Sequence, residues 1–229
     1  MKHLFVSRHL ESDSPLIKFC NDNGVELEAE SLLTFTSVLF DDIPKGDWLF
    51  FYSKSGIQHF LSQVDYAKLN HQFKIACFGP STANYWQDQI GSPANFIGDG
   101  KPENVPVDFR RILNENEVIV FVRAKHSKMS VQKAINDTFK CLDIVAYENT
   151  KRTDTMTLNN PDVAMLTSPL NADAFLEILP DYNGLIITLG TTTSSHLKKQ
   201  YQLTSFTATE ITEQGMLNKL LQLLEEKRL

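Results

Sequence analysis

The sequence repeats one pattern four times: an apolar run, a sharp turn of small hydroxylated residues and the start of a helix. Two copies lie in Asp47–Leu61 and Phe73–Ala83, and two more in Asp162–Leu176 and Gly184–Leu197. The later pair follows the earlier pair at a nearly constant offset. Self-similarity at so long a period predicts two related domains rather than a solenoid, whose repeats are much shorter.

Strands that alternate with helices predict parallel sheets with right-handed crossovers. The continuous apolar run of Trp48–Tyr52 indicates a strand that is buried on both faces. Two extended segments, near residues 28–38 and 141–150, separate the two halves of the repeat. We therefore predict an α/β fold with two doubly wound parallel-sheet domains, one inserted in the other and joined to it by a two-stranded linker. The expected bounds are 1–33 and 153–229 for domain 1, 38–143 for domain 2, and 34–37 and 144–152 for the linker strands.

Composition narrows the classes of protein. A length of 229 residues suits two domains of roughly 100 residues each. The formal net charge of −6 argues against a nonspecific nucleic-acid binder. No apolar run is long enough to span a membrane, and the early charges of Arg8 and Glu11 argue against a signal peptide. Cys20, Cys77 and Cys141 lie far apart, which predicts buried thiols in a reducing cytoplasm rather than a disulfide framework or a zinc site.

The four turns are the first candidates for function. In open parallel sheets, ligands bind outside the carboxyl ends of the strands, and each turn there opens a helix whose free N–H groups attract anions. The two predicted domains are expected to line a cleft with these turns. The alternative is that the Ser and Thr residues only cap their helices, which is their common use. The small polar residues that we expect to offer donors are Ser53, Ser55, Ser81, Ser168, Thr192 and Thr193.

Single residues near the strand ends add further candidates. Arg8 and Arg123 are placed to pair with carboxylates of a ligand, as Lys54 and Lys125 are to a lesser degree. The alternative is a solvated rim. Tyr147, in the second linker segment, is a candidate proton donor, although its ordinary pKa near 10 makes it a weak acid. A tyrosine that packs the hinge is the alternative.

Several common site motifs are missing. The sequence contains no GxGxxG dinucleotide turn, no P-loop lysine and no GxSxG elbow. Its six histidines show no metal-binding spacing, and we expect His9 and His126 at the surface. A third alternative, a sugar- or nucleotide-processing enzyme, needs a nucleotide site that the sequence does not show.

The chain resembles the uroporphyrinogen-III synthase family in its turns FYSKSGI, FGPSTA, LTSPLNADAFL and LGTTTSS, with IVAYEN between the pairs. The residues of these motifs are similar to those of the family's Bacteroidetes branch. The opening FVSR resembles that family's first strand and arginine, and the resemblance covers nearly the whole chain. It implies two α/β domains on a two-stranded linker. It also implies closure of hydroxymethylbilane, a linear tetrapyrrole with eight carboxylates, into uroporphyrinogen III with loss of water and inversion of the last ring. No cofactor or metal is implied.

Carried over residue by residue, the resemblance makes Tyr147 the proton donor to the departing hydroxyl. The substrate-binding residues that it and the turns together predict are Arg8, Ser53, Lys54, Ser55, Ser81, Thr82, Arg123, Ser168, Asn171, Thr192 and Thr193. The chain departs from the family at His9, where Pro is common, and in GTTT, where GPTT is frequent. We expect a monomer with no nucleic-acid or membrane partner. The alternative function is a non-catalytic protein of the same fold that binds tetrapyrroles or other polyanions.

Overall fold

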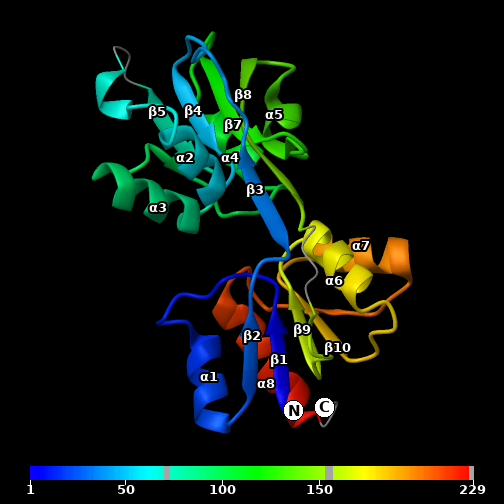
Figure 1. The fold of residues 1–229 in the computed structure, drawn as a ribbon. Coiled ribbons are helices and arrows are strands. Elements are labelled where there is room, and N and C mark those ends of the chain that lie inside the picture. Colours follow the sequence, from blue (N-terminus) through cyan, green and yellow to red (C-terminus); the bar gives the residue numbers. More distant parts are fainter. Residues whose placement is uncertain (70–72, 153–156, 227–229) are drawn as a thin grey trace. The chain divides into compact units, whose positions relative to one another are not determined.

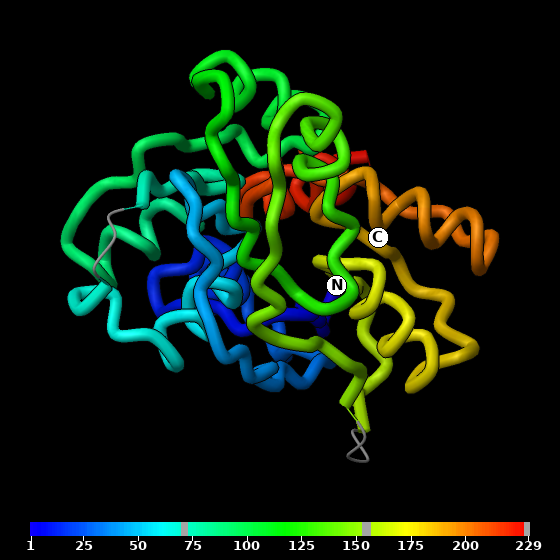
Figure 2. The backbone as a smooth tube through the Cα atoms, turned by 90° about the horizontal axis from the view of Figure 1, so that it is seen from above, coloured from blue at the N-terminus to red at the C-terminus, as the bar shows by residue number. Residues whose placement is uncertain are grey.

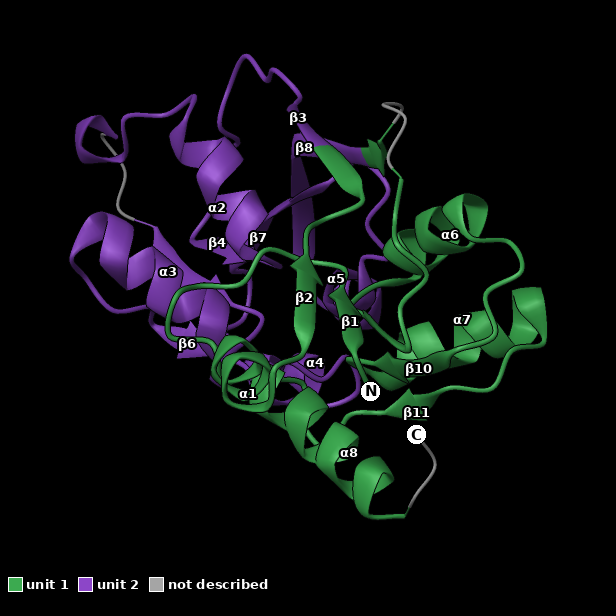
Figure 3. Ribbon diagram, turned by 60° about the horizontal axis from the view of Figure 1, so that its bottom comes forward, with its two compact units in different colours: residues 1–34, 150–229 green, residues 35–149 purple. Residues whose placement is uncertain are grey.

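The computed structural model describes residues 1–69, 73–152 and 157–226. It divides into two compact units, shown in different colours in Figure 3. Unit 1 contains Met1–Thr34 and Thr150–Leu229, and unit 2 contains Phe35–Asn149. Both chain ends therefore belong to unit 1, whereas unit 2 is one continuous stretch of the chain. Figure 2 shows the backbone coloured from the N-terminus to the C-terminus.

Unit 1 is built on a parallel sheet of five strands in the order β11-β10-β9-β1-β2. The strands are β1 (His3–Val6), β2 (Glu26–Ala29), β9 (Val163–Leu166), β10 (Leu185–Thr188) and β11 (Phe206–Thr207). The helices described with them are α1 (Pro15–Asn23), α6 (Pro169–Ile178), α7 (Thr191–Tyr201) and α8 (Glu213–Glu225).

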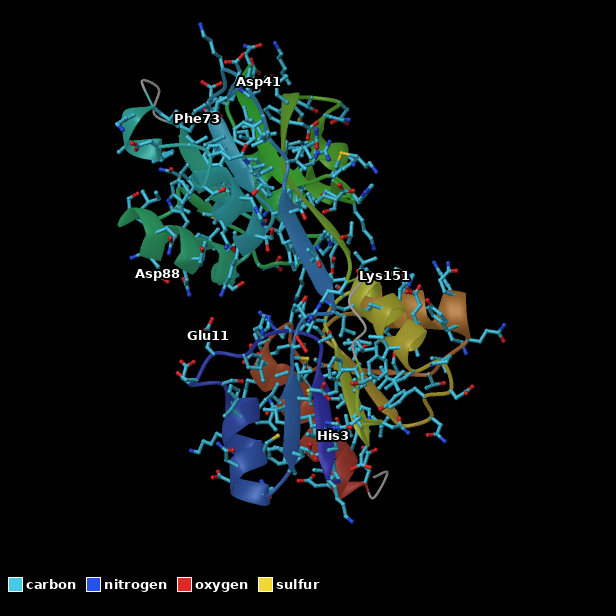
Figure 4. The ribbon with its side chains drawn as sticks, viewed as in Figure 1. His3, Glu11, Asp41, Phe73, Asp88 and Lys151 are labelled. Atoms are coloured by element: carbon cyan, nitrogen blue, oxygen red, sulfur yellow. The ribbon has the colours of Figure 1, made fainter. Side chains whose placement is uncertain are left out.

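Helices cover both faces of this sheet because its central strands β1 and β9 are buried along their whole length. Leu4 and Val6 of β1 pack in one cluster with buried residues of α1 and α8. Phe5, between them, points to the other face and packs with α6 and α7. Figure 1 shows α1 and α8 on one side of the sheet and α6 and α7 on the other. His3, labelled in Figure 4, marks the amino end of β1.

Unit 2 is built on six strands in the order β3-β8-β7-β4-β5-β6. The pairs from β8 to β6 are parallel. The strands are β3 (Leu33–Ser37), β4 (Trp48–Phe51), β5 (Lys74–Cys77), β6 (Phe96–Ile97), β7 (Val118–Ala124) and β8 (Lys140–Lys151). The helices described with them are α2 (Lys54–Leu61), the short 3-10 helix η1 (Tyr66–Lys68), α3 (Pro80–Ile90), α4 (Val105–Ile112) and α5 (Ser130–Ile135).

The apolar run of β4 serves both faces of this second sheet. Leu49 and Phe51 pack with α2 and α3. Trp48 and Phe50 point the other way and pack with α4 and α5, where Phe109 contacts both rings. Burial on both faces is the arrangement that continuous apolar strands require.

The repeat in the sequence is a repeat in structure. β4 and α2 occupy the same relative positions as β9 and α6, and β5 and α3 the same as β10 and α7. The predicted doubly wound parallel α/β fold is confirmed. The extended segment predicted near residues 28–38 contains two strands, β2 in the sheet of unit 1 and β3 in that of unit 2. Helix α5 ends at Ile135, and Asn136 opens a turn there, as Asn does at helix ends.

The cysteines are free thiols, and Cys20 and Cys77 are buried in the core as expected. Cys141 is half-buried. Within the described residues, no helix combines the length and the apolar character that a membrane crossing needs.

Candidate functional site

Four helices open at the carboxyl ends of their strands, two in each unit. Their first, non-helical residues are Ser53, Gly79, Ser168 and Gly190, all in extended conformation. Because β4 neighbours β5 and β9 neighbours β10, the two turns of each unit lie at one edge of its sheet. A helix start leaves backbone N–H groups free and carries the positive end of the helix dipole. Each unit thus presents two helix starts at one edge of its sheet.

The two serine turns use their hydroxyls as caps. Gly56 N–H donates to Ser53 Oγ at 3.1 Å, and Asn171 N–H donates to Ser168 Oγ at 3.2 Å. The capping role is therefore real in both turns. Only Ser53 has a second partner of chemical interest: its Oγ shares a hydrogen bond of 3.0 Å with the hydroxyl of Tyr147.

Tyr147 lies on β8 with its hydroxyl at the start of α2. It hydrogen-bonds to Ser53, and Ser55 also bonds to the phenol. Burial of the ring raises the pKa of Tyr147, and the hydrogen bonds of Ser53 and Ser55 lower it in part. The ring belongs to the core cluster between the sheet and α2. The two interpretations of this tyrosine, packing and proton donation, are therefore compatible.

An irregularity in the β7–β8 pairing turns Tyr147 toward α2. Arg123 pairs with Val145, but Ala124 pairs with Tyr147, so Ala146 is an extra residue on β8. Such a bulge places two successive side chains on one face. Ala146 and Tyr147 accordingly both belong to the cluster under α2. With regular alternation, one of them would face the opposite side.

Sequence reasoning missed His59 and Ser37. The imidazole of His59 stacks on the ring of Tyr147, with 5.2 Å between ring centroids and 13° between planes. His59 Nδ1 also shares a hydrogen bond of 2.8 Å with Ser37 Oγ. The available signal was spacing: His59 follows Ser55 by four residues on α2, which puts both on one side of the helix.

The two glycine turns differ from each other. A Cβ on Gly79 would lie 3.2 Å from the Cα of Gly100, whereas a Cβ on Gly190 would have no neighbour within 4 Å. The loop at Gly100 therefore covers the turn at Gly79, and the turn at Gly190 is open. Thr82 and Thr193, at matching positions of the two helices, are both buried.

The remaining turn residues are accessible. Lys54 and Ser81 are exposed at the starts of α2 and α3, and Thr192 is exposed at the start of α7. These three side chains are free to meet a ligand, in contrast to the buried Thr82 and Thr193.

The two candidate arginines have different surroundings. Arg8 is partly exposed, and its Nε lies 3.8 Å from Oε1 of Glu213, a long ion pair. The Nε of Arg123 donates to Asp143 at 2.6 Å, and its Nη1 donates to the carbonyl of Ala124 at 3.1 Å. Only 14% of the Arg123 side chain is exposed. Arg8 can still turn to a ligand, whereas Arg123 joins neighbouring strands.

Asn171 has a structural role. Its side chain is buried, accepts the N–H of Leu32 at 3.0 Å and donates to Ser168 Oγ at 3.2 Å. It therefore anchors the chain before β3 to the start of α6.

Charged groups near the end of β8 pair among themselves. Glu148 accepts hydrogen bonds from Lys125 at 3.1 Å and bonds His126 at 2.9 Å. His9 and His126 are exposed, as expected. β8 then runs on to Lys151, labelled in Figure 4, which pairs with Glu177 of α6. Over the described ranges, no cluster of His, Cys, Asp and Glu is placed to hold a metal ion.

The structure thus brings together one compact group from the predicted residues: Tyr147, Ser53 and Ser55 of unit 2, with His59 added. In unit 1 it joins Ser168 and Asn171 through their side chains. Among the described residues, no hydrogen bond joins Arg8 to the threonines at the start of α7.

Comparison with known proteins gives a consistent picture. The model of the family described as uroporphyrinogen-III synthase HemD matches residues 14–218. A search of curated proteins gives no significant match.

Solved structures with the same fold include a mutant uroporphyrinogen III synthase from Thermus thermophilus, with a TM-score of 0.63, 11% identity and coverage of 99% of this chain and 100% of that one. Uroporphyrinogen-III synthetase from Helicobacter pylori also has a TM-score of 0.63, with 18% identity and coverage of 97% and 100%. At these identities the likeness concerns the fold. The family model spans most of the chain, and the chain therefore belongs to the uroporphyrinogen-III synthase family.

Proposed function

We propose that the chain performs the reaction of its family with Tyr147 as the proton donor. The reaction closes hydroxymethylbilane into uroporphyrinogen III, and it begins with loss of the substrate's hydroxyl. Hydroxide is a poor leaving group, so a proton delivered to it in the transition state lowers the barrier. The products of this first step are water, the Tyr147 phenolate and a protonated, electrophilic azafulvene, which the last ring then attacks.

The observation that carries this proposal is the position of the Tyr147 hydroxyl at the start of α2. Ser53 Oγ accepts from Gly56 N–H, and its own hydroxyl hydrogen remains available for donation to the Tyr147 oxygen. Ser55 bonds to the same phenol. When Tyr147 gives up its proton, these donors and the positive end of the α2 dipole stabilise the phenolate.

The raised pKa of Tyr147 suits the same role. Burial keeps the phenol protonated at neutral pH, so the proton is present when the substrate arrives. The two serines then offset part of the cost of the charge. Such a phenol keeps its proton until the departing hydroxyl of the substrate lies beside it. It then acts as an acid, because that hydroxyl is a better proton acceptor.

The carboxylates of the substrate need many donors, and each unit offers its own. We propose that in unit 2 Lys54, Ser81 and the free N–H groups of α2 and α3 bind carboxylates. In unit 1 we propose the same of Arg8, Thr192 and the free N–H groups of α6 and α7. The buried hydroxyls of Thr82 and Thr193 and the side chain of Asn171 then hold these turns in shape.

Arg123 takes a different part. Because it is paired with Asp143 and mostly buried, we assign it to the β7–β8 connection beside the bulge. That connection fixes the stretch from which Tyr147 projects.

The test is an isomer assay with purified protein and hydroxymethylbilane. Uroporphyrinogen III as the main product supports the proposal. Isomer I alone contradicts it, and binding of product without turnover would favour the non-catalytic alternative.

Tyr147→Phe should lower kcat about 100-fold with little change in KM, because the ring remains and only the proton is lost. Tyr182→Phe is the matched control. Tyr182 is a buried tyrosine of unit 1 whose hydroxyl donates to the carbonyl of Leu185 at 3.1 Å. Its loss should affect stability and leave kcat unchanged. An unchanged kcat in Tyr147→Phe would remove Tyr147 from the mechanism.

We also propose that the chain acts as a monomer in the cytoplasm, without a metal or organic cofactor. Light scattering on the active protein tests the first point, since a dimer that keeps full activity would contradict it. Unchanged turnover after exhaustive chelation supports the proposal that the reaction needs no metal.

A further inference from the structure

The ring of Tyr147 is held by a second ring from α2. His59 stacks on it almost in parallel, at 5.2 Å between centroids. His59 is in turn fixed by Ser37 of β3, whose Oγ lies 2.8 Å from Nδ1. The three residues form a chain of contacts from β3 through α2 to β8.

A further aromatic ring completes the surroundings of Tyr147. Phe35 of β3 lies 6.1 Å from it, with 35° between ring planes. Aromatic rings packed together in this way restrict each other's orientation. The hydroxyl end of Tyr147 is bound by serines, and its ring is bound by His59 and Phe35.

We infer that His59 is a positioning residue for Tyr147, holding the phenol ring so that its hydroxyl stays at the start of α2. The inference rests on the proposed role of Tyr147 as proton donor. It follows from geometry: Ser53 holds the hydroxyl of the phenol and His59 holds the face of its ring, so that together they fix the direction in which the hydroxyl points. Misplacement of a reacting group by about 1 Å can cost about 100-fold in rate.

His59 packs against Tyr147 as a neutral ring. Burial lowers the pKa of His59, so its imidazole stays uncharged at neutral pH. Tyr147 is the titratable group that faces it. The nearest charged residue along β8, Glu148, is paired with Lys125 and His126, and Lys54 at the start of α2 is exposed.

A double-mutant cycle tests the inference. His59→Ala in the full chain should lower kcat about tenfold and change KM less than about twofold, because substrate binding does not need the ring. In the Tyr147→Phe background, the same change should lower kcat less than about twofold, since residues that act through one another are not additive. His59→Phe keeps a flat ring and should restore most of kcat.

A second measurement does not depend on activity. In protein labelled with ¹³C at tyrosine Cζ, the signal lost in Tyr147→Phe identifies Tyr147, and its titration gives the pKa. That pKa is raised by burial, so His59→Ala should move it down toward its ordinary value by admitting water, and His59→Phe should not.

The outcomes separate the two proposals. If His59→Ala lowers kcat equally in both backgrounds and leaves the titration of Tyr147 unchanged, His59 has only a structural role and the inference is overturned. If Tyr147→Phe alone leaves kcat unchanged, the proton-donor role fails instead. The inference that His59 positions Tyr147 for proton transfer then falls with it, even where the titration shows that the rings are in contact.

Discussion

Ser53 combines two functions in a single hydroxyl. It caps α2 by accepting from Gly56 N–H at 3.1 Å, and it bonds the phenol of Tyr147 at 3.0 Å. Ser168, at the same position of the repeat in unit 1, caps α6 in the same way, but its second partner is the amide of Asn171. The duplicated position has kept the cap in both units and has a tyrosine partner only in unit 2.

Ser53→Ala should therefore have two separate effects. Loss of the cap should lower the free energy of unfolding by about 1 kcal/mol. Loss of the bond to the phenol should raise the pKa of Tyr147 further, because that bond lowers it. Since a phenolate without its donor is a worse product of proton transfer, kcat should fall as well. Urea denaturation, ¹³C titration of Tyr147 and steady-state kinetics measure the three quantities.

Thr212→Ala is the control for this variant. Thr212 caps α8 in the same manner, accepting from Gly215 N–H at 2.9 Å, and has no part in the candidate site. A similar loss of stability is expected, without a change in kcat or in the pKa of Tyr147. If Ser53→Ala behaves like Thr212→Ala in all three measurements, the bond to Tyr147 has no chemical consequence.

At the scale of elements, the sequence predicts the turns better than it predicts what surrounds them. The apolar runs and the Ser, Gly and Pro residues after them identify the turns in which α2, α3, α6 and α7 begin, because strand burial and helix capping are local properties. The direction in which the Tyr147 side chain points is not determined by the local sequence. It depends on an extra residue, Ala146, in the pairing of β8 with β7, and no residue type in IVAYEN signals such a bulge.

The same limit explains the other surprises. The pairing of Arg123 with Asp143 joins residues 20 positions apart, and Ser37 meets His59 across 22 positions. Contacts at that range are set by the sheet order. A pattern read along the chain identifies the residue types but not the partner that each will find.

The glycine turns of α3 and α7 give a prediction at this scale. Gly79→Ala should lower stability by about 1 kcal/mol relative to Gly190→Ala, because only the first Cβ meets backbone, at 3.2 Å from Gly100. Both glycines are extended residues at a helix start, so the effects of Ala on capping and on the unfolded chain cancel in the comparison. Urea denaturation of the two variants measures the difference. Equal stabilities would mean that the loop at Gly100 yields without cost.

At the scale of the whole molecule, each unit has its own core. Two of the buried clusters belong to unit 1 and two to unit 2. The chain enters unit 2 through β3 and leaves it through β8, and these two strands are neighbours in the sheet of unit 2. On the side of unit 1, Arg152 N–H donates to the carbonyl of Leu32 at 3.0 Å. The insertion therefore begins and ends at one place, and its removal leaves no distant ends to join.

We accordingly expect a fragment of residues 33–151 to fold alone. It contains a complete sheet with helices on both faces, and a domain of this size buries enough surface for independent stability. It should unfold cooperatively in urea and keep the pKa of Tyr147 above its ordinary value, since Ser37, Ser53, His59 and Tyr147 all belong to it. It should not convert hydroxymethylbilane, because the proposed carboxylate donors of unit 1 are missing. A fragment that lacks cooperative unfolding would show that unit 2 needs unit 1 to fold. A folded fragment whose Tyr147 titrates like a free tyrosine would show that the environment of that phenol is not a property of unit 2 alone.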